Sequence, residues 1–405
     1  MISVAEAIGI VLARTQPLGA ERVALEDALR RVLAADVIAD TDLPPFDRAQ
    51  MDGFALRSAD VRDVPARLRV VGEAAAGRGW RGRLQAGEAV RIMTGAPLPE
   101  GADSVQQVEV TRESGDGQVV EIERATEPGQ FFVVRGSEIR AGETVLGEGE
   151  EVTAARAAVL ASFGYAEVPV RQRPRVAVLA TGTELVPVGE RPAEDQIRDS
   201  NTYSLAAYAR LAGARVERLP FAGDEPELLQ RLIAEAAGRA DLIVLSGGVS
   251  MGRYDFTKAA LHALGCEIFF ERVALRPGKP TVFARLPGGR QVLVFGLPGN
   301  PVSVSVTFNL FARTALLAMQ GARRPALPEE HAVLARPARG AAERVSYLPA
   351  ALRTDGDGRL LAEPLKWGGS SDFVAFARAT ALAVIPQGVR TAEAGTVVKV
   401  VRLPG

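Results

Sequence analysis

The feature that most constrains the fold is an alternation of short apolar runs with helical patterns between about Pro174 and Gly321. Strands that alternate with helices favour a parallel sheet flanked by helices, because a parallel connection needs a crossover of about a dozen residues. Ligands of such sheets bind beyond the carboxyl ends of the strands. The runs and the helical patterns that follow them are 176–179 with 201–211, 216–219 with 227–237, 241–245 with a helix from Phe256, and 292–295 with 302–319.

The remaining sequence divides into three further regions. Apolar residues at helical spacing predict helices in 4–12 and 25–32, on either side of Gly19, and again from Ala154 to Phe163. Short β-like runs with Gly and Pro between them, such as 68–71, 89–92 and 119–122, predict a small β domain. We therefore expect a discontinuous helical and linker module, an inserted β domain, the α/β domain and a β-rich tail, at 1–42 with 133–170, 43–132, 171–322 and 323–405 respectively.

Composition excludes several classes of protein. A formal net charge of −1 gives no general attraction to nucleic acid or anionic membranes, and no apolar run approaches the roughly 18 residues that span a bilayer. The first residues lack the basic start and apolar block of a signal peptide, and the single cysteine, Cys266, suits a reducing cytoplasm. With only two histidines, a zinc site or a histidine-based triad is not expected. Chemistry then rests on carboxylates, Lys, Arg, backbone amides and a hard cation.

The loop after the run 241–245 is rich in Gly and Ser, and the sequence of 245–255 is L-S-G-G-V-S-M-G-R-Y-D. Such a loop between a strand and a helix exposes backbone N–H groups where the helix dipole favours an anion. Asp255 stands at the end of the loop, where a carboxylate can cap the helix or hold a metal ion against a bound phosphate. The segment therefore predicts a phosphate-binding turn.

Further loops of the α/β region are expected at the same edge of the sheet. Glu184 follows the first strand, Lys279 projects from the turn R-P-G-K-P, and Asn300 with Pro301 makes a good helix start after the last strand. Either residue of the pair Ser200 and Asn201 can cap the helix from 201, or contact a ligand. Asp224, in G-D-E-P, is equally an ordinary helix-start residue. Amides and Lys279 suit phosphate oxygens, whereas the acids suggest Mg²⁺ or contacts to hydroxyl and amine donors.

These motifs resemble a known family. S-G-G-V-S-M-G with Asp255, P-G-K-P and G-L-P-G-N-P-V-S are similar to the molybdopterin-binding α/β domain of molybdenum cofactor biosynthesis proteins. In the N-terminal half, 44–55 reads P-P-F-D-R-A-Q-M-D-G-F-A and resembles the P-x-F-D-x-S-x-M-D-G-Y-A signature of the MoeA family. R-I-M-T-G-A-P-L-P at 91–99 is similar to a second signature of that family, and the resemblance covers the whole chain.

The resemblance implies a fold and an activity. The fold would be a central three-layer α/β/α domain, a helical linker module, an inserted small β domain and a barrel-like C-terminal β domain. The activity would be that of a molybdopterin molybdenumtransferase, which inserts molybdenum from molybdate into adenylylated molybdopterin and releases AMP with the finished cofactor, dependent on Mg²⁺. The family's homodimers build the active cleft with the β domain of the neighbouring subunit, and a transient contact with the pterin adenylyltransferase is expected.

Carried over position by position, the resemblance implies site residues with three roles. The catalytic residues would be Asp255, Lys279, Glu184 and Asp52. The metal ligands would be Asp224, Asp255, Glu184 and Glu138. The substrate contacts would be Thr94, Ser246, Gly247, Gly248, Arg276, Pro298, Gly299, Asn300, Arg344 and Ser370.

The chain departs from the family's pattern at four positions. Ala49 replaces a frequent Ser, Thr183 a common Asp, and Arg276 a frequent Lys, while Glu138 stands where Asp is more usual. Two other functions stay open. One is the pterin adenylyltransferase itself, and the other is a non-catalytic pterin-binding scaffold, since the related C-terminal domain of gephyrin belongs to a receptor anchor. The residues do not separate molybdate from tungstate, because the two oxyanions are alike in charge and size.

Overall fold

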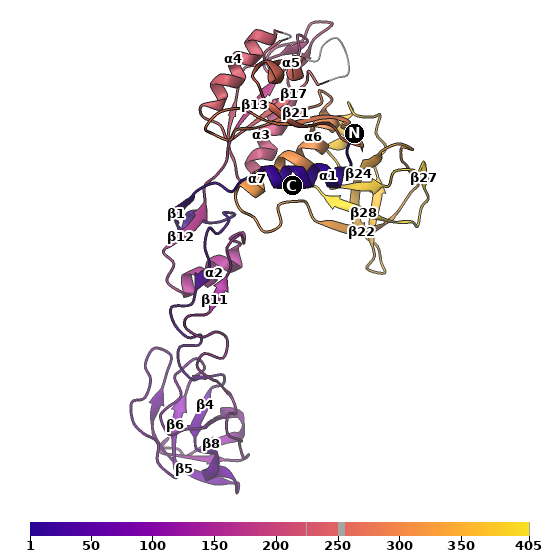
Figure 1. Ribbon diagram of the computed structural model, residues 1–405. Coiled ribbons are helices and arrows are strands. Elements are labelled where there is room, and N and C mark those ends of the chain that lie inside the picture. The colour runs from indigo at the N-terminus through magenta and orange to yellow at the C-terminus, as the bar shows by residue number, and fades with distance from the viewer. Residues whose placement is uncertain (224, 250–255, 405) are drawn as a thin grey trace. The chain divides into compact units, whose positions relative to one another are not determined.

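The computed structural model describes residues 1–223, 225–249 and 256–404. The chain forms two compact units, each described here by itself (Figure 1). The first comprises Met1–Ala35, Glu148–Ala154 and Glu167–Gly405, and the second comprises Asp36–Gly147 and Ala155–Ala166. The four domain boundaries expected from the sequence stay predictions.

The first unit is built on a six-stranded sheet with the order β16-β13-β17-β21-β20-β18. Four strands are parallel, as the alternation predicts: β13 (Arg175–Ala180), β16 (Arg215–Arg218), β17 (Leu242–Ser246) and β21 (Leu293–Leu297). β20 (Pro280–Arg285) runs antiparallel to β21, and β18 (Glu267–Arg272) runs antiparallel to β20. The sequence pattern does not show this pair, because no helix separates the two strands. The sheet is therefore mixed, with a parallel part.

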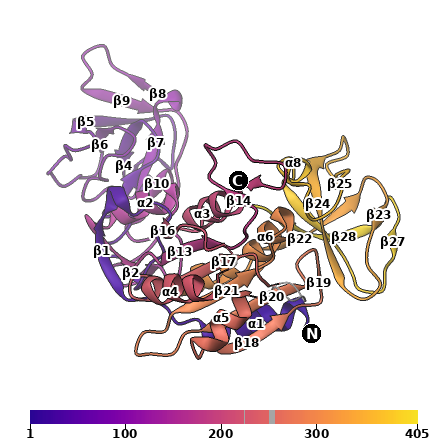
Figure 2. The ribbon, with the colours of Figure 1, turned by 90° about the horizontal axis from the view of Figure 1, so that it is seen from above.

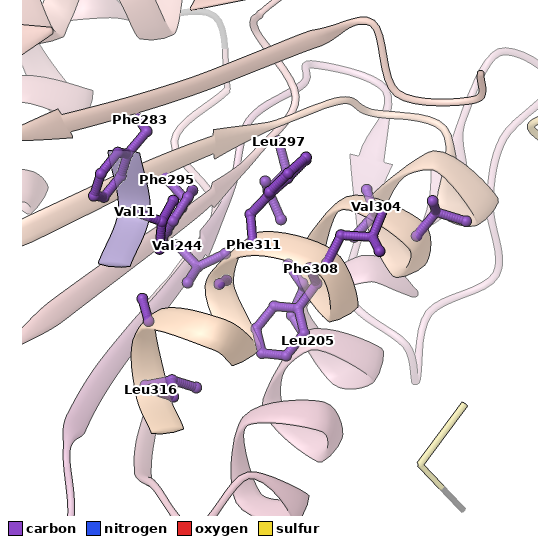
Figure 3. Close-up of a cluster of buried hydrophobic side chains, with 14 of the residues drawn as sticks. Val11, Leu205, Val244, Phe283, Phe295, Leu297, Val304, Phe308, Phe311 and Leu316 are labelled. Carbon is purple, nitrogen blue, oxygen red and sulfur yellow. The ribbon is translucent and has the colours of Figure 1, made fainter. Parts of the chain in front are cut away.

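Helices cover both faces of this sheet and make three layers. Side chains of a strand alternate between faces, so Val176 and Val178 join one core cluster while Ala177 and Leu179 join another. The first cluster holds α1 (Val4–Arg14), α3 (Asn201–Leu211), α6 (Pro301–Thr307) and α7 (Arg313–Met319); the second holds α4 (Pro226–Ala237) and α5 (Phe256–Ala263). Figure 3 shows Val244, Phe295 and Leu297 of the sheet beside Leu205, Val304, Phe308, Phe311 and Leu316 of the helices.

The helix from Pro301 to Met319 is long and apolar enough to span a membrane, which the sequence reading did not anticipate. Its middle, Phe308–Ala312, is a π-helical turn between α6 and α7. However, 83% of its apolar stretch is buried inside the protein. Its hydropathy is explained by its place between α1, α3 and the sheet, because a helix that is apolar all round is typical of a core.

The C-terminal part closes into a five-stranded barrel, as the resemblance implies. Its strands have the order β24-β25-β22-β28-β26, and β26 pairs back with β24. They are β22 (Glu329–Leu334), β24 (Val345–Thr354), β25 (Leu360–Pro364), β26 (Ala381–Ile385) and β28 (Val397–Arg402), with the short pair β23 (Ala338–Arg339) and β27 (Thr391–Ala392). β19 (Leu275–Arg276) pairs with β24 and so joins the barrel to the α/β domain, beside which Figure 2 shows it.

One predicted helix is wrong. The region 25–32 contains only the 3₁₀ turn Leu25–Asp27, and the residues before it form β1 (Ala20–Ala24), paired antiparallel with β12 (Glu167–Arg171). Leu29 is 54% exposed, so the apolar spacing there does not mark a buried helix face. Pairing with a segment almost 150 residues away overrides the local pattern. The other two predictions are confirmed by α1 and by α2 (Ala154–Ser162).

The second unit contains the predicted small β domain. Its six strands have the order β7-β4-β6-β5-β9-β8: β7 (Ser104–Gln107), β4 (Gly53–Leu56), β6 (Glu88–Ile92), β5 (Ala66–Ala74), β9 (Val119–Ile122) and β8 (Thr111–Glu113). Short pairs of β2 (Val37–Ile38) with β11 (Thr144–Leu146), and of β3 (Arg48–Ala49) with β10 (Phe132–Val133), flank this sheet in the chain. The glycine of the M-D-G signature has a local reason, because a Cβ on Gly53 would collide with the carbonyl oxygen of Gln106.

Candidate functional site

A cavity of about 910 Å³ lies at the carboxyl ends of β13, β17 and β21. Its walls are the loops after these three strands, the start of α3, the strand β15 (Ile197–Arg198), and Ser371 with Phe373 from the segment before the barrel strand β26. The parallel part of the sheet predicts this position, because all three strands end at one edge. The structure brings together seven predicted site residues here: Glu184, Ser246, Gly247, Gly248, Pro298, Gly299 and Asn300.

The turn after β17 is tightly packed against its neighbours. Gly247 and Gly248 have φ angles of +96° and +63°, which L side chains rarely adopt. A Cβ on Gly247 would lie 2.6 Å from the carbonyl oxygen of Thr181, and one on Gly248 would lie 2.7 Å from Oγ1 of Thr257. The N–H of Gly247 also donates to the carbonyl of Leu297 at 3.0 Å. Glycine at both positions therefore lets the turn approach the adjacent loops, and it leaves the backbone facing the cavity.

Asn201 connects three walls of the cavity. Its Nδ2 donates to Oγ of Ser246 at 2.8 Å and to the carbonyl oxygen of Gly299 at 2.7 Å. The Ser246 hydroxyl in turn donates to the carbonyl of Pro298 at 3.4 Å. Two oxygens at this site, Oδ1 of Asn201 and Oγ1 of Thr181, are buried without a hydrogen-bond partner among the described residues. Asn201 therefore holds the loops in place and also presents an unsatisfied acceptor.

The cap of α3 differs from the expected one. Ser200 occupies the N-cap position, but neither its side chain nor that of Asn201 makes a capping hydrogen bond. Instead Asp199, which is 6% exposed, accepts the backbone N–H of Thr202 at 3.0 Å and also the hydroxyl of Thr202. The D-x-x-T spacing of 199–202 is the signal that the sequence reading missed. Asp199 also lines the cavity.

Glu184 is the acid of the cavity that remains available for a ligand. It follows β13 and precedes β14 (Leu185–Val186), and its carboxylate makes no hydrogen bond or ion pair within 1–223, 225–249 and 256–404. A Cβ on Gly182 would collide with this carboxylate, so the missing side chain at 182 makes room for it. Together with Oγ1 of Thr181, it supplies the oxygen donors that a hard cation prefers.

Mg²⁺ therefore fits the donors present, although they are too few for a complete coordination shell. The described residues contain no group of three or more His, Cys, Asp or Glu side chains arranged to hold a metal. Two of the acids expected as ligands, Asp224 and Asp255, lie outside the described residues.

Asn300 stands at the N-cap of α6 with Pro301 at its first position, as predicted. Its side chain does not cap the helix, however, and instead donates to Oγ of Ser370 at 2.9 Å. The carbonyl of Ser370 accepts the N–H of Val302 at 3.0 Å. Ser370 is thus fixed against the rim of the cavity through two contacts with the start of α6.

Arg276, Lys279 and Arg344 do not line this cavity, although Pro280 does. Arg276 ends the short strand β19 and donates from Nη1 to the carbonyl of Gly340 at 3.2 Å, and Arg344 donates to the carbonyl of Leu275 at 3.5 Å. The two arginines are therefore gathered where β19 pairs with the barrel strand β24. The half-buried Lys279 has no side-chain partner in the part of the chain that the structure describes.

Three predicted site residues lie in the second unit: Asp52, Thr94 and Glu138. Oδ1 of Asp52 accepts the backbone N–H of Thr94 at 2.6 Å and the Thr94 hydroxyl at 2.7 Å. These two hydrogen bonds hold the pKa of the exposed Asp52 carboxyl below its usual value, because they favour the charged form. Glu138 lies apart from them and is 3.8 Å from a guanidinium nitrogen of Arg48. The structure therefore joins Asp52 to Thr94, while the ion pair of Glu138 is with Arg48, and the roles of all three residues stay predictions.

Known proteins align with almost the whole chain. A relative named molybdopterin molybdenumtransferase from Bacillus subtilis (strain 168) is 36% identical over 386 residues, which are 94% of this chain and 89% of the relative. The chain belongs to the MoeA family. A second relative of the same name, from Nostoc sp. (strain PCC 7120), is 36% identical over 397 residues, or 95% of this chain and 89% of the relative. As a member of this family the chain is a transferase of molybdenum cofactor biosynthesis.

Family models and solved structures agree with this assignment. The MoeA N-terminal region (domains I and II) matches residues 2–164, a probable molybdopterin binding domain matches 177–318, and the MoeA C-terminal region (domain IV) matches 331–403. The crystal structure of a molybdopterin biosynthesis MoeA protein from Pyrococcus horikoshii is 32% identical with a TM-score of 0.81, and each chain covers 100% of the other. The multidomain fold expected from the MoeA resemblance is thereby confirmed.

Proposed function

We propose that this MoeA-family protein transfers molybdenum from molybdate to adenylylated molybdopterin and releases AMP with the finished cofactor. The observation that carries the proposal is the cavity at the carboxyl edge of the sheet, where Glu184, an acid with no partner among the described residues, faces two glycine-containing loops. Its volume of about 910 Å³ suits a large ligand, since pockets for small molecules typically measure about 300–1,000 Å³. The family relationship supplies the reaction class, and the cavity supplies a place for it.

The cavity is suited to the negative charge of both substrates. The α3 helix begins at its wall, so the positive end of the helix dipole lies near a bound phosphate or oxyanion. The turn of Gly247 and Gly248 brings backbone close to the same space. Asn201 and Ser246 can orient the ligand, because their polar atoms already lie between the loops. We propose that Lys279 and Arg276, which belong to the adjoining turn, offset the negative charge of the bound substrates.

The acids of the site suggest a role for Mg²⁺. We propose that Glu184 holds it together with Asp224 and Asp255, the latter two from outside the described residues, and that Glu138 is structural. When bound, Mg²⁺ supplies positive charge that offsets the negative charge developing on the phosphate bond during cleavage. The chain's own residues then orient the adenylylated pterin and keep the phosphate within reach.

We further propose that the active form is a cytoplasmic homodimer. In such a dimer, Asp52 and Thr94 of one copy would complete the cleft of the other, as the MoeA resemblance implies. Their mutual hydrogen bonds support a joint role, because they fix the orientation of the Asp52 carboxylate. Gel filtration combined with light scattering tests this directly, and a monomer at micromolar concentration with full activity would contradict it.

The deciding experiment measures release of AMP from adenylylated molybdopterin with Mg²⁺, with and without molybdate, for the wild type and Glu184→Gln. Removal of one electrostatic contact to the reacting group typically costs on the order of 100-fold in rate, so we expect a loss of that size. Glu190→Gln is the matched control, since Glu190 is an exposed acid just beyond β14 that does not line the cavity.

Each outcome of this experiment has a consequence. Molybdate-dependent release that falls in Glu184→Gln but not in Glu190→Gln supports the proposal. Binding of the pterin without release would instead indicate a scaffold, and pyrophosphate release from ATP would indicate an adenylyltransferase. Tungstate in place of molybdate, at equal concentration, measures the preference between the two oxyanions.

A further inference from the structure

A second cavity, of about 590 Å³, lies at the opposite edge of the same sheet. Its lining includes Arg175 and Arg215, the first residues of β13 and β16, and Asp241 and Leu293 at the starts of β17 and β21. Because these four strands are parallel, their amino ends share one edge, away from the candidate active site at their carboxyl ends. No step of the proposed reaction uses this cavity.

The second cavity is strongly basic, since five arginines and two acids line it. Both acids are already paired. Asp241, 7% exposed, accepts from Nη2 of Arg175 at 2.7 Å and from Nη2 of Arg290 at 3.1 Å, so one carboxylate serves two guanidinium groups. Glu21 is bound at 2.5 Å to the buried Arg31. The acids of the cavity are therefore engaged with other arginines, and the charges of Glu21 and Asp27 offset only part of the effect of the arginines around Arg173.

Arg173 and Arg215 carry remaining positive charge of the cavity. Neither guanidinium makes a hydrogen bond or an ion pair to any residue that the structure describes. Burial lowers the pKa of Arg173, and the nearby charges of Arg31 and Arg215 lower it further. Arg31, which is bound to the cavity residue Glu21, is 5% exposed, and its Nε is buried without a partner among the described residues. Like charges are thus held together at some electrostatic cost, which a bound anion would relieve.

We propose that this second cavity binds a small molecule that carries a phosphate or diphosphate group. Guanidinium groups match phosphate oxygens with two parallel N–H donors each, and those of Arg173 and Arg215 have no acceptor among the described residues. Three glutamines also line the cavity and provide uncharged donors and acceptors for the rest of the molecule. The volume lies within the range of small-molecule sites. This inference does not depend on the proposed molybdenum chemistry.

The test is equilibrium dialysis of the full-length protein against pyrophosphate, comparing the wild type with the double variant Arg173→Gln and Arg215→Gln. We expect the double variant to hold one equivalent less than the wild type, or to bind that equivalent at least tenfold more weakly. The matched control is the double variant Arg210→Gln and Arg231→Gln. It removes the same charge from two exposed arginines that do not line the cavity.

The count of equivalents separates the second cavity from the candidate active site. Pyrophosphate bound at the candidate active site would remain bound to the Arg173→Gln and Arg215→Gln variant, so only the lost equivalent belongs to the second cavity. Equal binding by the wild type and this variant would overturn the proposal, as would an equal loss in the control variant. Thermal unfolding of all three proteins shows whether each is folded, because substitutions at partly exposed positions should change the midpoint little.

Discussion

Asn201→Ala should loosen the candidate active site and destabilise the first unit by about 2 kcal/mol. The substitution removes two hydrogen bonds, of 2.8 Å to Ser246 and 2.7 Å to Gly299, and each contributes about 1 kcal/mol net. Asn300→Ala is the matched comparison at the same cavity. It removes one exposed bond, to Ser370, and no helix cap, so we expect at most about 1 kcal/mol.

Urea unfolding followed by tryptophan fluorescence measures both losses. The first unit contains Trp367 and the second contains Trp80, so a Trp80→Phe background makes the signal specific for the first unit. Proteins of several units need not unfold in one step, and this background avoids mixing two transitions. The reasoning would be refuted if Asn201→Ala and Asn300→Ala shifted the midpoint equally, or if Asn201→Ala left it unchanged.

Two further predictions concern single titrating groups. The two hydrogen bonds from Thr94 lower the pKa of Asp52. The contribution of the Asp52 carboxylate to the stability of the folded protein is therefore fully present above the ordinary pKa of 3.8, and it is lost as the pH falls through the folded-state pKa. The difference in urea midpoint between the wild type and Asp52→Asn should therefore be constant near neutral pH and shrink below about pH 4; a difference that does not change with pH would contradict this. Burial raises the pKa of Cys266 to about 11, so at pH 8 only about one thiol in a thousand is ionised. Iodoacetamide should modify the folded protein at least tenfold more slowly than the urea-unfolded protein, and equal rates would contradict this.

Much of the α/β domain could be predicted from the sequence because its signals are local. The helix expected at 201–211 is α3 with the same bounds, and the ends of each predicted parallel strand lie within two residues of the observed ones. The failures come from pairings over long distances in the chain. β1 pairs with β12, and β19 pairs with β24, about 70 residues further on. No periodicity within a window of a dozen residues contains such information.

The candidate site likewise has features that the local sequence predicts and others that depend on pairings over long distances in the chain. The convergence of Glu184, Ser246 and Gly299 follows from parallel strands that end at one edge, and it could be predicted without coordinates. The position of Arg276 could not be predicted, because β19 pairs with the barrel strand β24, and Arg276 therefore lies next to the barrel. The sequence also left open whether Asn201 caps α3 or contacts a ligand. In the structure Asp199 accepts the capping hydrogen bond, and the side-chain amide of Asn201 instead donates to the loop after β17.

The two edges of the sheet differ in how they can attract an anion. Helices of a parallel α/β domain begin at the carboxyl edge and end at the amino edge, so their dipoles favour anions only at the former. A cavity at the carboxyl edge can therefore rely on glycine turns and the start of α3. At the amino edge, α3 and α4 present their carbonyl ends before β16 and β17, which repel an anion. A site there needs charged side chains, and the five arginines of the second cavity meet that need. Since side-chain charges near the surface are screened by salt, binding at the amino edge should weaken with ionic strength more steeply than binding at the carboxyl edge.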